Sequence, residues 1–66
     1  MYYWCVMLFP NGRGIAVFSE EKWQEHREKL PAENFLGGGF DSNVNILLQE
    51  AYQQLNIQKL DMEFYL

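Results

Sequence analysis

The chain has one cysteine, one histidine and no long hydrophobic run, and each of these shortages excludes a class of protein. Because Cys5 has no partner within the chain, an intramolecular disulfide framework is excluded and a reducing compartment is expected. One cysteine and one histidine do not make a zinc site, and no acidic run has the spacing of a calcium-binding loop. We therefore expect neither a metal nor a cofactor.

The longest hydrophobic run, MYYWCVMLF, is nine residues long, whereas a helix that crosses a bilayer needs about 20. The run has no basic leader and no small-residue cleavage pattern, so it is not typical of a signal peptide. These features predict an intact cytoplasmic protein with an ordered N-terminus.

Basic residues are also few. Five Lys and Arg stand against nine Asp and Glu, which gives a net charge of −4. This balance argues against a direct complex with nucleic acid, since neutralisation of phosphates supplies most of the affinity in such complexes. It favours neutral or basic partners instead.

The chain has 66 residues, of which 48% are hydrophobic and 17% are aromatic. We expect one domain over residues 1–66. A chain of this length buries only about 60% of the surface that its unfolded form exposes. The aromatic content is high for that size, so we expect part of it at an interface with another chain.

Aromatic-rich and alternating segments predict three strands. Residues 2–9 are dense in aromatic and β-branched types and have two apolar faces, which is typical of a strand covered on both sides. The following PNGRG predicts a hairpin with a type I′ turn at Asn11–Gly12, before a second strand at 15–18. Residues 60–66 alternate between apolar and polar types, as a half-buried strand does.

Two helices are predicted between the second and third strands. Ser19 is a suitable N-cap for a first helix that ends at Pro31. Asp41 or Ser42 caps a second helix of about 14 residues with a wide apolar face. Residues 31–40 are interpreted as a connection between the two helices.

The predicted fold class is α+β with the order β-β-α-α-β: a β-hairpin, two helices and a C-terminal strand. We expect a three-stranded antiparallel sheet with the helices packed mainly on one face. The two apolar faces of residues 2–9 equally allow an alternative with one helix on each face.

The stretch NFLGGGFDSN, residues 34–43, is the segment that most resembles a binding site. Glycines ahead of a helix allow a phosphate to approach the backbone. The candidate ligand-binding residues are therefore Gly37, Gly38 and Gly39. A P-loop, however, has Lys and then Ser or Thr after its last glycine, where this chain has Phe40 and Asp41. We favour a turn between two helices, and a third option is a loop that displays Phe35 and Phe40 to a partner.

The sequence contains no pattern of catalytic residues. Cys5 lies inside an apolar strand, and His26 is surrounded by charged residues on the first helix. A structural thiol and a surface histidine are therefore favoured. Since no general-base pair or Ser/His/Asp arrangement is present either, we predict that the protein is not an enzyme.

We expect a small acidic binding module that acts by occupying the surface of a partner protein. The predicted form of this function is a phage-type inhibitor of a host defence or nucleic-acid-binding protein. Aromatic residues on an uncovered sheet face and carboxylates on the first helix would make the contacts. The predicted partner-binding residues are Tyr2, Trp4, Arg13, Phe40, Tyr65, Glu21, Glu25 and Glu28.

Two other functions stay open. One is an oligomeric binder or sponge for a small nucleotide-like molecule, with pockets between the subunits of a homodimer or higher oligomer. The other is a structural subunit of a larger assembly, in which the apolar sheet face is covered by a neighbouring subunit.

Overall fold

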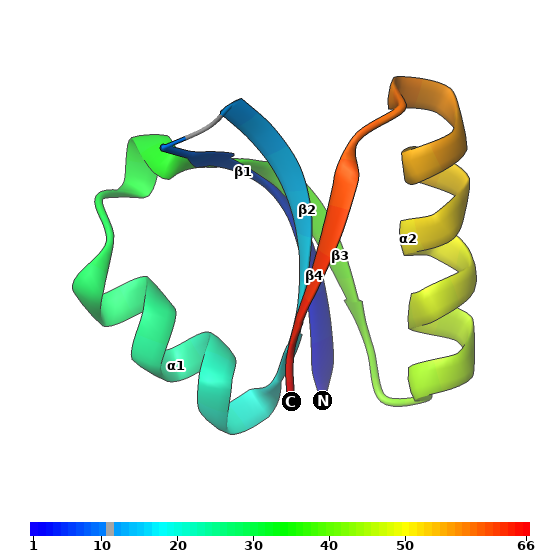
Figure 1. The fold of residues 1–66 in the computed structure, drawn as a ribbon. Helices are drawn as coiled ribbons and strands as arrows, with labels where there is room; N and C mark the ends of the chain where they lie inside the picture. Colours follow the sequence, from blue (N-terminus) through cyan, green and yellow to red (C-terminus); the bar gives the residue numbers. More distant parts are fainter. Residues whose placement is uncertain (11) are drawn as a thin grey trace.

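The computed structural model describes residues 1–10 and 12–66 and has the α+β class predicted from the sequence. Figure 1 shows two helices that flank a twisted sheet. In chain order the elements are β1 (Tyr2–Phe9), β2 (Gly12–Ser19), α1 (Glu20–Lys29), the short 3₁₀ helix η1 (Ala32–Asn34), β3 (Phe35–Asp41), α2 (Val44–Gln58) and β4 (Asp61–Tyr65). The order β-β-α-β-α-β has one strand more than the predicted β-β-α-α-β.

The sheet has four strands in the order β3-β1-β2-β4. β1 runs antiparallel to both β2 and β3, whereas β4 runs parallel to β2. The prediction of a three-stranded antiparallel sheet is therefore wrong both in the number of strands and in the direction of β4. The chain reaches β4 from β2 through α1, β3 and α2, which is long enough to return it in the parallel direction.

The predicted hairpin of β1 and β2 is confirmed. Its register runs from Tyr2 opposite Ser19 to Phe9 opposite Gly12. The type I′ turn predicted at its tip involves Asn11, which lies outside the described residues. The hairpin supplies the two central strands of the sheet, so the rest of the fold is built on it.

β3 is the largest departure from the prediction, which treated residues 31–40 as a connection. Gly38 lies so close to β1 that a Cβ there would overlap the Trp4 carbonyl oxygen, so only glycine fits. Gly37 has a φ of +140°, and the pairing of β3 with β1 shifts register beside it. Consecutive glycines normally weaken a strand, but here they allow two backbones to approach closely.

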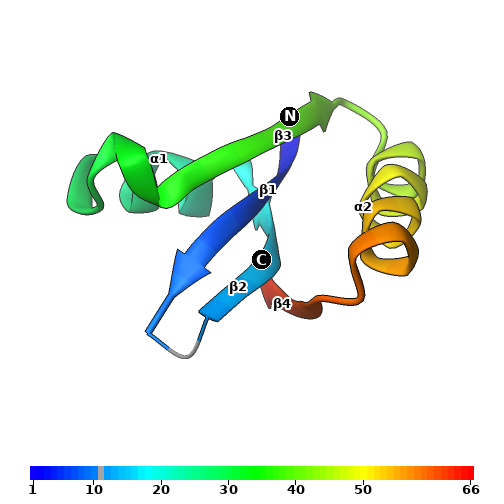
Figure 2. The same ribbon diagram turned by 90° about the horizontal axis from the view of Figure 1, so that it is seen from above.

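One helix lies on each face of the sheet, as Figures 1 and 2 show. The expectation that both helices pack mainly on one face is therefore wrong, and the alternative holds. The cause is β1, whose two faces are both apolar and both need a cover. The core on the α2 face consists of Val6, Ile15, Val17, Leu47 and Ala51. The core on the α1 face consists of Cys5, Met7, Ala16 and Phe18.

Both helices begin at side-chain caps. Ser19 Oγ accepts a hydrogen bond from the first turn of α1 at 3.4 Å, as the sequence predicts. The cap of α2 is Asn43, whose Oδ1 accepts from the Asn45 N–H at 2.9 Å, rather than the predicted Asp41 or Ser42. Asp41 instead accepts from the Asn43 N–H at 2.8 Å and holds the cap from outside the helix.

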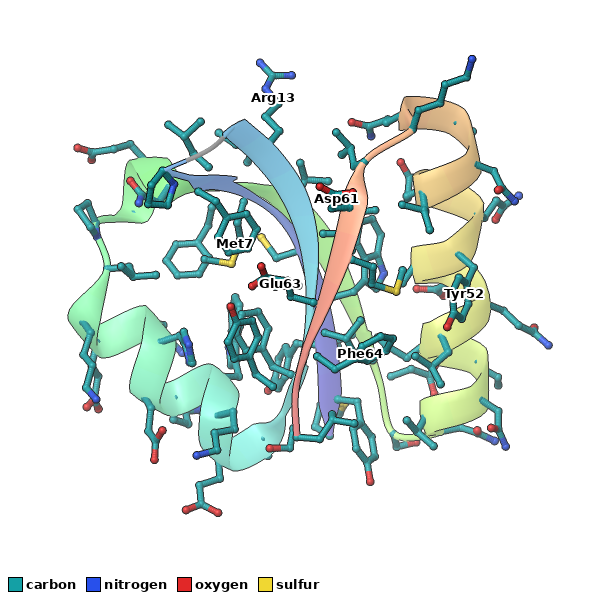
Figure 3. The ribbon with its side chains drawn as sticks, viewed as in Figure 1. Met7, Arg13, Tyr52, Asp61, Glu63 and Phe64 are labelled. Carbon is teal, nitrogen blue, oxygen red and sulfur yellow. The ribbon has the colours of Figure 1, made fainter. Side chains whose placement is uncertain are left out.

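The C-terminal strand alternates as predicted. Figure 3 shows Phe64 on the α2 side of β4 and Glu63 on the α1 side. Met62 packs against the α2-face core and Tyr65 against the α1-face core. Phe64 keeps 48% of its surface exposed because β4 is an edge strand.

Candidate functional site

The described residues form a hollow of about 290 Å³ over β3, on the sheet face that α1 covers. We call it the aromatic hollow. Its lining residues are Tyr3, Trp4, Cys5, Trp23, Phe35, Gly37, Gly38, Gly39 and Phe40. Aromatic rings and a glycine strand therefore meet at one edge of the sheet, and they come from β1, α1 and β3.

The rings of the aromatic hollow support one another. Tyr3 of β1 stacks on Trp23 of α1 with ring centroids 4.8 Å apart. Trp23 meets Phe35 edge-on at 5.5 Å, and Phe40 lies 6.2 Å from Tyr3. Trp23 also contacts the buried ring of Phe18 at 5.4 Å. Since these rings are already held by the core, fixing them should cost little conformational entropy when a ligand binds.

The aromatic hollow is open because β3 has glycines where other strands have side chains. Gly38 pairs with Cys5, and the segment from Gly37 to Gly39 has no Cβ to fill the space beside Phe40. On the helix side, every residue of α1 keeps some exposure to solvent. Phe40, the outer wall, is 66% exposed. The hollow is therefore accessible from the β3 edge of the sheet.

The ionisable groups of the hollow stay protonated at neutral pH. The Glu20 carboxylate accepts a hydrogen bond from the Tyr3 phenol and so raises the pKa of Tyr3 above its ordinary 10.0. Burial and the negative charge of Glu20 raise this pKa further, whereas the positive charge of Arg27 lowers it. Burial raises the pKa of the Cys5 thiol above 9.0, opposed in part by backbone hydrogen bonds from β3. A buried thiol with a raised pKa is a poor nucleophile. The hollow thus offers a recognition surface rather than a reactive group.

The α2 side of β3 carries a carboxylate. Trp4 Nε1 donates a hydrogen bond to Glu50 Oε2 at 3.1 Å. A Cβ on Gly39 would lie 2.8 Å from that nitrogen and 3.2 Å from that oxygen, so both groups lie directly over this glycine. β3 is therefore flanked by the aromatic hollow on one side and by negative charge on the other.

The two edges of the sheet differ in their protection. β4 carries Asp61 and Glu63, both exposed, and charged side chains on an edge strand discourage pairing with other strands. β3 has neither charge nor proline from Phe35 to Phe40. Its pairing with β1 is regular from Gly37 to Asp41. Asp41 is the charged residue of β3 and lies at its C-terminal end, so the rest of this edge, beside the aromatic hollow, has no charged side chain.

Three aromatic residues among the predicted partner-binding residues are half-buried. Tyr2 and Trp4 pack against the core under α2. Tyr65 stacks on Phe18 at 5.3 Å and lies 4.7 Å from the ring of His26. The prediction assumed an uncovered sheet face to display these residues, but in the described chain each face carries a helix.

Most of the other predicted partner-binding residues lie at the surface, away from the aromatic hollow. Arg13 projects from the hairpin end of the sheet (Figure 3) and is exposed. Glu21 and Glu28 are exposed on α1, while Glu25 is half-buried, with its Oε2 3.6 Å from Lys22 Nζ. These carboxylates form part of a solvated helix face.

The aromatic hollow combines residues that the sequence-based prediction assigned separately. It brings the predicted Phe40 together with the three glycines of the alternative ligand site. Trp4 borders the hollow, but its side chain packs on the opposite face of the sheet, under α2. The hollow also contains Phe35, which the sequence analysis named only in the option of a displayed loop, and Tyr3 and Trp23, which were not predicted as site residues. The sequence held a signal for Trp23, which is the single large apolar residue of the charged helix α1. Such a residue is expected to pack against the sheet.

Comparisons with protein-family models, with curated proteins and with solved structures return no match for this chain. Within residues 1–10 and 12–66, no three Cys, His, Asp or Glu side chains cluster so that they could hold a metal ion. Neither helix of the described chain is long and apolar enough to cross a membrane. The function is therefore inferred from the geometry of the hollow and of β3.

Tyr65 should make the fold less stable as the pH rises above about 10. Its phenol donates a hydrogen bond to the Glu63 carboxylate, which together with burial and the negative charge raises the pKa of Tyr65 from 10.0 to about 12. Between these pH values the unfolded chain loses the proton and the folded chain keeps it, so the free energy of unfolding falls as the pH rises. We expect this fall to be less steep in Tyr65→Phe, as measured by urea unfolding. Equal slopes in the two proteins would contradict the role of this bond.

Proposed function

We propose that the chain is a non-enzymatic binding module that occupies the surface of a partner protein through β3 and the aromatic hollow. The observation that carries the proposal is the hollow itself, a set of Tyr, Trp and Phe rings beside the outer strand β3. Tyr and Trp are among the residue types that contribute most to binding energy at protein interfaces. The proposed compartment is the cytoplasm, in keeping with the free and buried Cys5.

The lining of the aromatic hollow supports recognition rather than catalysis. Apart from carbon-rich rings and glycine backbone, the ionisable groups that line it are the Tyr3 phenol and the Cys5 thiol. Both have raised pKa values, so neither is a base or an anionic nucleophile at neutral pH. Such a lining can stack against a partner and exclude water from the contact.

The partner in this proposal is a host defence or nucleic-acid-binding protein, which the chain inhibits in the manner of phage-encoded inhibitors. The support is general: small size, a net charge of −4 and no recognisable catalytic motif are typical of such inhibitors. The α1 carboxylates of Glu21, Glu25 and Glu28 would add contacts to a basic surface.

A second candidate function is the capture of a small flat molecule by an oligomer. The observation that favours it is the position of Gly37, Gly38 and Gly39 beside the stacked rings of Tyr3 and Trp23. A ligand ring would stack there while its polar groups approach the glycine backbone. Because the hollow is open at its outer wall, a second subunit would be needed to enclose the ligand.

The proposed function predicts a contact at Phe40 and not at the opposite edge of the sheet. We expect Phe40→p-benzoylphenylalanine, in the full chain expressed in its own host cells, to crosslink on irradiation to a larger protein. The reason is that this side chain is 66% exposed at the mouth of the hollow. The matched control is the same substitution at Phe64, which is 48% exposed on β4 and should give little of that product.

The crosslinked products and native mass spectrometry of the chain from the same cells separate the two candidates. A complex with a larger protein supports the binding module. A multiple of the chain mass plus the mass of a small molecule supports the oligomeric binder. Equal crosslinking at Phe40 and Phe64 would contradict the placement of the site at the aromatic hollow.

A further inference from the structure

We infer that the segment bound at β3 is an extended strand of the partner protein, which pairs with the β3 edge and alternates aromatic or branched apolar residues with Lys or Arg. The inference rests on the proposed function and specifies the chemistry of its partner. Three features of β3 carry it: a free backbone edge, the aromatic hollow on its α1 side and a carboxylate on its α2 side.

β3 offers a free row of backbone hydrogen-bonding groups. It pairs with β1 on one side and is the outer strand of the sheet. In such a strand every second residue directs its N–H and C=O away from its neighbour, where an added strand can pair at about 4.8 Å. On β4, the other edge strand, the exposed carboxylates of Asp61 and Glu63 discourage pairing with an added strand. The sheet is therefore built to accept a strand at β3.

On the α1 side, the aromatic hollow would receive the apolar side chains of the added strand. Phe35 and Phe40 lie on this face, since they pair with Met7 and Tyr3 of β1. Side chains at paired positions of neighbouring strands lie side by side on one face. A phenylalanine or isoleucine of the partner would therefore fill the space above the glycines and cover Phe40.

On the α2 side, Glu50 would meet a basic side chain. Its carboxylate lies over Gly39. On an added strand, the residue paired with Gly39 would have its Cβ about 5 Å from the position of Gly39, on the same face as the carboxylate. The Trp4 indole donates to Oε2, so a lysine or arginine can donate to the other carboxylate oxygen. Asp41 lies two residues along the strand on this same face, since it pairs with Tyr2. Because one face of β3 is apolar and the other carries carboxylates, a strand that fits it has apolar and basic side chains in alternation.

A second copy of this chain fits the β3 edge less well. Another β3 has no basic residue to meet Glu50 or Asp41, and another β4 would bring Asp61 and Glu63 toward them. With a net charge of −4 on each chain, two copies also repel. A partner strand with Lys or Arg removes this repulsion and suits both faces.

The test uses the full chain labelled with ¹⁵N and a blocked peptide, which we call the lysine peptide. In this peptide three phenylalanines alternate with two lysines between terminal threonines. On titration we expect the amide signals of β3 and the Trp23 indole signal to shift. We also expect hydrogen exchange in β3 to slow, because solvent-facing backbone groups become paired. A peptide with glutamates in place of the lysines should bind about tenfold more weakly or worse.

Variants of the protein test the role of the carboxylate. Glu50→Gln removes the charge but keeps an oxygen acceptor for the Trp4 indole, so the fold should be retained. We expect its affinity for the lysine peptide to fall about fivefold. The matched control is Asp61→Asn on β4, which should leave that affinity unchanged. Unchanged affinity in Glu50→Gln would overturn the assignment of basic side chains to this face.

Peptides methylated on alternate backbone nitrogens test the strand pairing itself. Because one alternate set of amides faces β3, methylation of that set should abolish binding, while methylation of the other set should not. Equal effects of the two sets, signal shifts centred on β4, or dimerisation of the chain through β3 would overturn the inference. Crosslinking of Phe40 to a larger protein without binding of the lysine peptide would leave the proposed function intact and refute the strand pairing alone.

Discussion

Gly38→Ala is expected to remove most of the stability of the protein. The added methyl group would overlap the Trp4 carbonyl oxygen and lie 2.9 Å from Cys5 Cα, and both atoms belong to the backbone of β1. Backbone in a central strand cannot rotate aside as a side chain can, so β3 must move away. The expected cost is about 3 kcal/mol or more, which is comparable with the whole stability of a domain this small, about 3–5 kcal/mol.

Gly37→Ala is the matched control for this prediction. Gly37 has a φ of +140°, but a Cβ there meets nothing within 4 Å. Its substitution therefore costs backbone strain alone, about 1–3 kcal/mol for a conformation that side chains rarely adopt. Urea unfolding followed by tryptophan fluorescence measures both variants. If Gly38→Ala were as stable as Gly37→Ala, the close approach of β3 to β1 would be refuted. Variants of Gly38 thus test the fold, and binding must be tested elsewhere, at Phe40 or Glu50.

The elements that could be predicted from the sequence are those whose signals lie within a few residues. Ser19 caps α1, and the helix ends at Lys29, just before Pro31, because a proline ring cannot continue a helix. The alternation of residues 60–66 predicts β4 because a strand places successive side chains on opposite faces. In each case the deciding interaction is local, so the sequence pattern was sufficient.

β3 was missed because its strand conformation depends on a contact that is distant in sequence. The interpretation of 31–40 as a connection followed from the freedom of glycine to adopt the positive φ of turns, and glycine also has a low strand propensity. The decisive fact is that Gly38 lies against the backbone of Trp4 and Cys5. The parallel direction of β4 was missed for a related reason, since nothing within residues 60–66 determines which neighbour the strand will pair with.

The aromatic hollow was missed because each of its rings already had a sufficient local explanation. Tyr3 was one of many apolar residues on β1, and Trp23 was the anchor of α1. Only the placement of β3 beside β1 brings Phe40 to Tyr3 and leaves glycine backbone between them. The same placement puts Glu50 over Gly39. A site made by three elements is set by topology, which residue spacing alone does not determine.

Phe18→Ala is expected to cost about 3–5 kcal/mol, the second large loss in the protein. Phe18 is 0% exposed at the centre of the α1-face core. Its ring contacts Trp23 at 5.4 Å, Tyr65 at 5.3 Å and His26 at 5.0 Å. Truncation leaves a cavity beside a central strand that cannot move to close it. It also releases Trp23, so the aromatic hollow should lose the wall that is anchored in the core.

Phe64→Ala makes the same chemical change on the adjacent strand and is the matched control. Phe64 pairs with Val17 but is 48% exposed, so its truncation should cost about 1 kcal/mol. Calorimetry should place the Tm of Phe18→Ala about 10 °C or more below that of Phe64→Ala. Phe64→Ala should also keep its affinity for the lysine peptide, because it changes neither the hollow nor Glu50. Equal losses of stability would mean that Phe18 does not hold α1 on the sheet, and the hollow would then lack the rigidity on which its proposed function depends.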